Sequence, residues 1–455
     1  MPGRGEGLCP KGRGDCAWRG EGLGPVLLES LQSGCLFQIA ERGSTVRTEV
    51  VGGVTTFVSM AYIIVVNPAI LSAAGIPSGP STVATILTAA FGTLLMGIYA
   101  NRPIAVAPYM GENAFIAFGL AAFGITWQQR LGAVFVSGVI FLIITLVGVR
   151  TWLADAVSKS MKHSFGAGIG LFLTFIGLFE AGVVKAGQGV PVQLGDIRSR
   201  PVLLAVFGFV VIAVLLYRRV PGAILIGIAA TAVAGSIAGV GKLPTSVIAL
   251  PYDLSPIALQ LDVVSIFRVA FLPILLTLFL MSLFDTLGTL VALDPEGDLK
   301  RPMLVDALSC TFSGLVGTST SGAYIESSTG IREGARTGLA SVVTAALFVV
   351  SLFFIPLLEP MQSLQYAYAP ALLIVGMLML NAAAKIDFED LTELVPAFTT
   401  VVVMVFTFNI ANGLTAGLAL YPIMKVLAGR GRELRPATVV LAALCGLYYA
   451  FGVPH

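Results

Sequence analysis

The sequence predicts an all-α polytopic membrane protein with about 14 transmembrane segments, arranged as two inverted repeats of seven. Hydrophobic residues make up 56% of the 455 residues and charged residues only 11%, whereas a soluble globular chain is usually about 25% charged. Apolar runs long enough to cross a bilayer recur from Val50 onwards. Two runs are interrupted by Gly, Pro and hydroxyl residues, which predicts broken third and tenth segments that carry short extended stretches.

The composition also excludes several function classes. The net charge is only +2, and no basic cluster with interleaved aromatic residues is present, so we expect no nucleic-acid partner. The five cysteines and two histidines show neither metal-ligand spacing nor a disulfide framework. We therefore expect no metal site and no cofactor, and the lipid bilayer is the first partner that the sequence indicates.

The chain begins with a polar stretch and continues with the predicted spans. Residues 1–40 are rich in Gly and Arg and lack the apolar stretch of a signal peptide, so we expect a disordered tail. The last apolar run, 437–451, is short for a full span, and an interfacial position stays open for it. The predicted spans cover 50–72, 81–100, 104–124, 131–149, 164–182, 201–217, 221–240, 267–292, 303–318, 320–334, 337–358, 367–384, 392–411 and 413–429.

The distribution of basic residues supports these spans. With the N-terminus in the cytoplasm, 17 Lys and Arg residues fall on inner connections and 6 on outer ones. Cytoplasmic loops of membrane proteins carry such an excess. We expect a multi-pass protein of the plasma membrane in this orientation.

An odd number of spans in each half places the two halves in opposite orientations. Inverted repeats of this kind bind substrate near the midplane, at discontinuous helices. The two broken segments, 104–124 and 320–334, come third in each half. Direct similarity between the halves is faint, with TTFVSMAY (55–62) against TLFLMSLF (277–284) as the best match.

The stretch TSTSGAYIESSTG (318–330) surrounds one acid, Glu326, with small and hydroxyl residues. Gly322 allows the backbone to leave helical geometry, and a half-helix that starts near Glu326 would present free N–H groups. A charged residue at mid-membrane costs about 2.5–3.5 kcal/mol and usually marks a substrate or ion path. The alternative is a packing stripe in which Glu326 pairs with Arg332.

A second acid, Asp285, lies in the apolar run LFDTLGTL (283–290) with no Lys or Arg in its span. We expect it to hold a proton for coupling or to bond to substrate. The alternative is an acid satisfied by Thr289 or by a neighbouring helix.

The matching segment of the first half reads VAPYMGENAFIAFGL (106–120). Pro108 breaks the helix, and Glu112 and Asn113 then present an acid and an amide. An amide both donates and accepts hydrogen bonds, as the edge of a heterocycle requires. Phe115 is a candidate stacking wall, with core packing as the alternative. Acidic residues 294–298 and 387–393 lie at predicted inner boundaries, where solvated loop faces are expected.

Five stretches in order resemble one family: TTFVSMAYIIVVNPAIL (55–71), APYMGENAFIAFG (107–119), LFDTLGTL (283–290), TSTSGAYIESSTGIREGARTGL (318–339) and VPAFTTVVVMVFTFNIANGLTAG (395–417). The chain is similar to the AzgA-like adenine/guanine/hypoxanthine permeases of the nucleobase–cation symporter type 2 (nucleobase–ascorbate transporter) superfamily. The resemblance covers about residues 45 to 435.

The resemblance implies a division into two domains. A core domain would comprise residues 45–150 (spans 1–4) and 263–358 (spans 8–11). A gate domain would comprise 151–262 (spans 5–7) and 359–435 (spans 12–14), followed by a short apolar segment, 436–455. The family commonly forms homodimers through the gate.

The resemblance also implies site residues. The family's binding acids fall on Asp285 and Glu326 and its third-span polar residue on Asn113, and we add Phe115 and the stretch Gly322, Ala323 and Tyr324. One position departs from the family, since Glu112 stands where many members carry a small or apolar residue. We expect Asp285, Glu326 and Glu112 to be the proton-coupling candidates. For Glu112 the alternatives are a change in base selectivity and a side chain that faces away from the site.

The leading hypothesis is a secondary active transporter that imports purine nucleobases (hypoxanthine, guanine or adenine) by proton symport, with coupling first of all at Asp285. A transporter of another base, uracil or xanthine, is the alternative on the same fold. Two buried acids argue against an anion carrier and a passive channel. An intramembrane protease would need a paired motif, and neither HExxH nor Gly-x-Gly-Asp occurs, so we expect no enzyme.

Overall fold

The computed structural model describes residues 37–451 apart from 121–123, 149–156, 188, 242–243, 245, 269–270 and 295–297. Most of the predicted tail therefore lies outside the described residues. Its last four residues form a turn in which the carbonyl of Phe37 accepts a hydrogen bond from the Asn101 amide (3.2 Å). These four residues are part of the packed structure.

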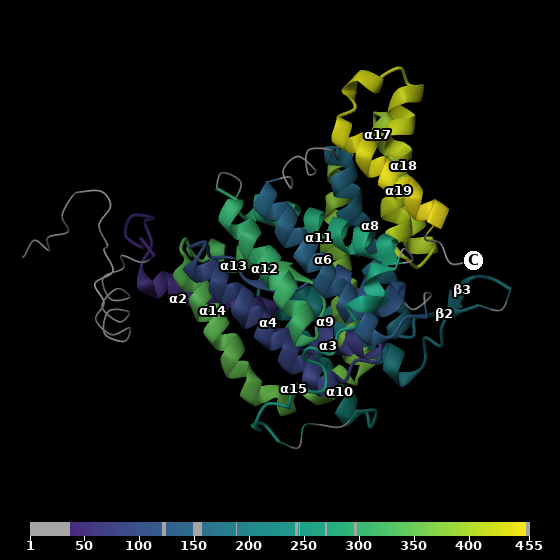
Figure 1. Ribbon diagram of the computed structural model, residues 1–455. Helices are drawn as coiled ribbons and strands as arrows, with labels where there is room; N and C mark the ends of the chain where they lie inside the picture. Colours follow the sequence, from purple (N-terminus) through teal and green to yellow (C-terminus); the bar gives the residue numbers. More distant parts are fainter. Residues whose placement is uncertain are drawn as a thin grey trace, which may run out of the picture.

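The first half of the chain contains long helices and one broken segment (Figure 1). The break begins after α4, where a three-residue strand precedes a short helix and a π-helical turn. A small hairpin, β2–β3, follows α8. The elements are α2 (Val46–Met60), α3 (Ile63–Ser72), α4 (Ser78–Ile98), β1 (Val106–Pro108), α5 (Met110–Ala114), the π-helical turn Phe115–Gly119, α6 (Trp127–Val147), α8 (Lys159–Glu180), β2 (Val184–Ala186), β3 (Val192–Leu194), α9 (Arg200–Tyr217) and α10 (Ala223–Ile237).

The second half repeats this order with a second broken segment after α12. Short 3₁₀ turns lie at Val264–Phe267, Leu352–Phe354, Asn381–Lys385 and Gly431–Glu433. The main elements are α11 (Leu272–Leu293), α12 (Lys300–Val316), β4 (Ser321–Ala323), α13 (Ser327–Arg332), α14 (Gly338–Ser351), α15 (Ile355–Gln362), α16 (Gln365–Leu380), α17 (Leu391–Phe406), α18 (Ile410–Leu427) and α19 (Pro436–Phe451).

The predicted membrane architecture is confirmed. Nine helices within the described residues are long and apolar enough to cross a bilayer. The other predicted spans correspond to the shorter helices α10, α12 and α17 and to the two broken segments. The apolar C-terminal segment forms a further helix, α19, which packs against α18.

Local sequence explains where the elements begin and end. Thr126 and Gln129 form a reciprocal capping box at the start of α6, and Ser158 caps α8. Gly317 ends α12 with φ +100°, a left-handed conformation that glycine adopts without strain. The chain then runs extended into β4.

The helices pack in two groups. α2, α4, α6, α12 and α14 pack against one another, and α8, α9, α10, α16, α17 and α18 form the second group. In Figure 1, α2, α4, α12 and α14 lie together on the left, whereas α17, α18 and α19 project at the upper right. Small residues permit the closest approaches: a Cβ on Gly97 would lie 2.6 Å from the Gly338 carbonyl oxygen.

Candidate functional site

The two broken segments meet at their extended stretches. β1 and β4 pair antiparallel, with Val106 opposite Ala323, Ala107 opposite Gly322 and Pro108 opposite Ser321. All six residues are buried. Each strand leads towards a short helix, α5 or α13. The predicted extended stretches followed by half-helices are therefore present, and they pair with each other.

Two tyrosines flank this pair of strands. The rings of Tyr109 and Tyr324 stack with centroids 6.4 Å apart and planes 10° apart. The Tyr324 hydroxyl donates a hydrogen bond to the Pro108 carbonyl oxygen. A Cβ on Gly322 would collide with the Tyr109 ring. Gly322 is therefore required by close packing against this ring.

Ala323 is fixed by an acid that sequence reasoning missed. Its N–H donates to Oδ1 of Asp306 on α12 (2.9 Å), and Asp306 is fully buried. Oδ2 of Asp306 accepts from Thr286, whose hydroxyl also lies 3.0 Å from that of Tyr109. Asp306 therefore connects β4, α11 and the Tyr109 ring. The N–H of Ala323 and the N–H and hydroxyl of Tyr324 are therefore bonded within the protein.

Glu326 lies at the N-terminal end of α13, half-buried. Its Oε1 accepts a hydrogen bond of 2.7 Å from the hydroxyl of Tyr62, at the junction of α2 and α3. Arg332, the alternative partner considered above, instead donates to the Ser328 carbonyl (3.2 Å). The half-helix start therefore presents an acid that is held by a phenol rather than by a cation.

Asp285 is also half-buried, in the middle of α11. Its carboxylate lies within electrostatic reach of Asp306 and Glu326. No described residue donates a hydrogen bond to it. The acid was expected either to face a ligand or to be satisfied by Thr289, and no bond to Thr289 is present among the described contacts. Its carboxylate therefore keeps its hydrogen-bonding capacity.

Asn113, on α5, is fully buried and belongs to a polar cluster around Asn67 of α3. Its Nδ2 donates to Oδ1 of Asn67 (2.9 Å), and Asn67 donates in turn to Thr85 (2.7 Å) and Thr318 (2.9 Å). Oδ1 of Asn113 has no hydrogen-bond partner within the described structure. A buried acceptor without a donor costs free energy, so this oxygen is suited to receive an N–H group.

Glu112 and Phe115 stand on either side of Asn113. Glu112 is fully buried, and its Oε2 accepts from Ser282 of α11 (3.0 Å) and from Thr320, next to β4. Phe115 is 1% exposed and packs against Gly119. The Phe115 ring is thus part of the protein core in this conformation.

Sequence reasoning did not single out Tyr62, Asn67, Tyr109 or Asp306. The rule that found Asp285, an acid inside an apolar span, also applies to Asp306, which lies six residues beyond Lys300 at a predicted boundary. Asn67 interrupts an otherwise apolar run, Ile63–Ser72. The two tyrosines carry no such signal, since aromatic residues are common in membrane helices.

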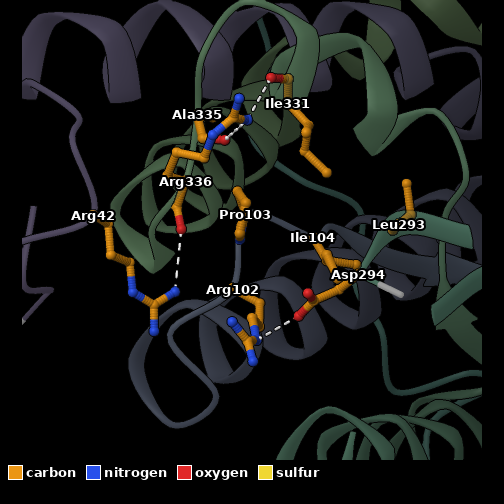
Figure 2. A pocket seen from close by; sticks show the side chains of 9 residues that line it. All are labelled: Arg42, Arg102, Pro103, Ile104, Leu293, Asp294, Ile331, Ala335 and Arg336. Atoms are coloured by element: carbon orange, nitrogen blue, oxygen red, sulfur yellow. Dashed lines mark hydrogen bonds and ion pairs between the residues drawn. The ribbon is translucent and has the colours of Figure 1, made fainter. Parts of the chain in front are cut away.

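A cavity of about 410 Å³ lies at the ends of α11 and α13, beyond the paired strands (Figure 2). Arg102 forms an ion pair with Asp294 there (2.9 Å). Figure 2 shows the Arg336 guanidinium turned back onto the carbonyls of Ile331 and Ala335. The lining is charged and lies at helix ends, so we place the binding site at the paired strands instead.

Comparison with known proteins agrees with this architecture. Among solved structures, the transmembrane domain of a cyanobacterium bicarbonate transporter, BicA, superposes with a TM-score of 0.61 at 19% identity, covering 80% of this chain and 97% of that one. The murine anion transporter Slc26a9 in the inward-facing state gives a TM-score of 0.62 at 11% identity, covering 92% and 73%. At these identities the likeness shows the fold, with its inverted repeats.

Sequence comparison shows the family. The profile described as "Permease family" matches residues 47–415. The guanine/hypoxanthine permease PbuG of Bacillus subtilis is 40% identical over 91% of this chain and 99% of its own length. The adenine permease AdeP of Escherichia coli is 38% identical over 92% and 96%. The chain therefore belongs to the AzgA-like permeases of the nucleobase–cation symporter type 2 superfamily.

Proposed function

We propose that this protein imports purine nucleobases across the plasma membrane together with protons. The observation that carries the proposal is the meeting of two half-helices beside Asp285, Glu326 and Asn113. Asp285 and Asn113 each keep an oxygen without a hydrogen-bond donor from a described residue, and purine N–H groups are donors of the required kind. The printed names of the relatives, guanine/hypoxanthine and adenine permease, support the same substrate class.

In this proposal Asp285 and Glu326 bind the ring N–H and exocyclic groups of the base, and Asn113 provides the remaining hydrogen bonds. A proton bound at Asp285 moves together with the base and couples uptake to the proton gradient. Access alternates when the core domain moves against the gate domain, through which two copies would associate. The N-terminus would lie in the cytoplasm, as the distribution of basic residues indicates.

The test is uptake of labelled hypoxanthine, guanine, adenine, xanthine and uracil into proteoliposomes, with and without an inward proton gradient. We expect purine uptake that rises with the gradient and is lost in Glu326→Ala. Glu333→Ala is the matched control, because this exposed acid directly follows α13. If only uracil or xanthine is taken up, that base is the substrate in place of hypoxanthine, guanine and adenine. If folded and inserted protein takes up none of these bases, the proposal is refuted.

Asp285→Asn separates binding from coupling. The amide keeps the size of the side chain but cannot exchange a proton at physiological pH. We expect Asp285→Asn to bind the base and to lose gradient dependence. Normal proton-driven accumulation by this variant would remove Asp285 from the coupling mechanism.

A further inference from the structure

The most deeply enclosed acid of the site is Glu112. Its side chain is fully buried, while Asp285 and Glu326 are half-buried. Two hydroxyl groups, from Ser282 and Thr320, reach its Oε2. Its Oε1 is buried and has no hydrogen-bond partner within the described structure. One half of this carboxyl group is thus paired and the other half is not.

The groups around Glu112 do not neutralise a negative charge. Its titratable neighbours are Asp285 of α11, Asp306 and Cys310 of α12, and Tyr109. α3 brings only uncharged residues, with Asn67 and Ser72 the polar ones. α8 packs on α5 near Ile169, whereas its charged and titratable residues are confined to its two ends (Lys159, Lys162, His163 and Glu180).

We infer that Glu112 is a proton-binding site of the transport cycle, a second one beside Asp285. A carboxylate enclosed with other acids and without a basic partner is strongly disfavoured, and one bound proton removes the charge. A hard metal cation would need about six oxygen ligands, and the structure leaves only one unpaired oxygen on Glu112. The proton adds to the carboxylate from one solution and leaves to the other, so that charge balances over a cycle.

The hydrogen bonds of Glu112 connect its protonation to both broken segments. Glu112 itself lies on α5, which follows β1, and Thr320 immediately precedes β4. Ser282 lies on α11 three residues, slightly less than one helical turn, before Asp285. The loss or gain of charge at Glu112 therefore acts on the paired strands and on the helix that carries the substrate acid. This coupling role rests on the proposed function, whereas proton binding itself does not.

The experiment is a pH titration of the purified full-length protein by infrared difference spectroscopy, without substrate. Protonated carboxyl groups show a C=O stretching band that ionised ones lack. We expect a band that grows as the pH falls within the physiological range and is lost in Glu112→Gln, which keeps the shape of the side chain. Glu333→Gln is the matched control and should leave that band in place.

The pH dependence of base binding then tests the coupling role of Glu112. In proteoliposomes, the pH dependence of base binding reports the number of protons bound with the base, because Kd changes up to about tenfold per pH unit for each linked proton. We expect Glu112→Gln to reduce this slope by about one proton. The inference is overturned if Glu112→Gln and the unmodified protein give the same titrating bands. If those bands differ but no purine is taken up, the proposed function fails and the proton site stands.

Discussion

Tyr62 and Glu326 form the contact on which the proposed binding acid depends. The phenol hydroxyl lies 2.7 Å from Oε1 of the carboxylate and comes from the break between α2 and α3, more than 260 residues earlier in the chain. A hydrogen bond to a charged group contributes about 1.5–3 kcal/mol. The hydroxyl therefore fixes the carboxylate in one orientation.

Removing this hydroxyl tests the arrangement. We expect Tyr62→Phe to weaken purine binding by about tenfold or more, the equivalent of about 1.4 kcal/mol. Binding of labelled base to purified protein measures the effect. Tyr217→Phe is the matched control, since Tyr217 is 89% exposed at the end of α9. An unchanged Kd in Tyr62→Phe would show that Glu326 is positioned by other contacts.

At this scale the sequence predicts charged site residues better than their partners. Asp285, Glu326 and Asn113 stand out because a polar group inside an apolar span is costly. Tyr62 and Tyr109 do not stand out, because their role arises from contacts with residues more than 170 positions away. The structure also assigns Phe115 to the core, which sequence alone left open.

The paired strands β1 and β4 are the element that organises the site. Their closest contact is between Gly322 and the Tyr109 ring, where there is no room for a side chain. Overpacking at such a contact costs about 1–3 kcal/mol and shifts the backbone. A methyl group there would push the two strands apart.

Gly322→Ala is therefore expected to lower the thermal unfolding temperature and to abolish base binding together. Gly288→Ala is the matched control, because a Cβ on Gly288 of α11 would meet no atom within 4 Å, and alanine favours a helix over glycine by about 1 kcal/mol. Thermal unfolding in detergent and equilibrium binding measure both effects. A Gly322→Ala protein that binds as tightly as the unmodified one would contradict the assignment.

The sequence predicted the breaks but not their pairing. Gly and Pro residues mark both interruptions, and the matched third position in each half predicts their symmetry. The register of β1 against β4 depends on the packing of α3, α4, α11 and α12 around them, which no local pattern encodes.

A network of ion pairs joins the end of α18 and the segment that follows it to the start of α17. Both helices belong to the second helix group. Lys425 of α18 is buried, with its Nζ 3.0 Å from Glu393 and 3.2 Å from Glu433. Arg430 lies 2.6 Å from Asp390, which caps α17. The expectation of a solvated loop face for residues 387–393 is therefore wrong for Asp390 and Glu393, because the compensating cation comes from a later helix.

This network predicts sensitivity to acid. Hydrogen bonds from Thr392 and Arg430, and the charge of Lys425, hold the pKa of Asp390 below its usual value of about 3.9. A lowered pKa in the folded state contributes stability that is present above that usual value and is lost as the pH falls through the folded-state pKa. We therefore expect the protein to unfold at a lower temperature when the pH is below about 4 than at neutral pH.

Asp390→Asn should remove part of this acid dependence. The variant is expected to be less stable than the unmodified protein at neutral pH, and the difference should narrow as the pH is lowered. Thermal unfolding measured at a series of pH values gives both curves. A constant difference at all pH values would show that ionisation of Asp390 does not stabilise the fold.

The pairing of β1 with β4 has a consequence for biosynthesis. Backbone hydrogen bonds at the ends of both strands come from the other half of the chain, since the Tyr109 N–H donates to the Thr320 carbonyl and the Tyr324 N–H donates to the Ala105 carbonyl. The interior of a bilayer offers no water as a substitute. During translation the first segment must therefore await a partner on the order of 200 residues away, while ribosomes add about 5–20 residues per second. The nascent first half is an incomplete folding unit for at least ten seconds or so, and membrane chaperones would encounter it in that state.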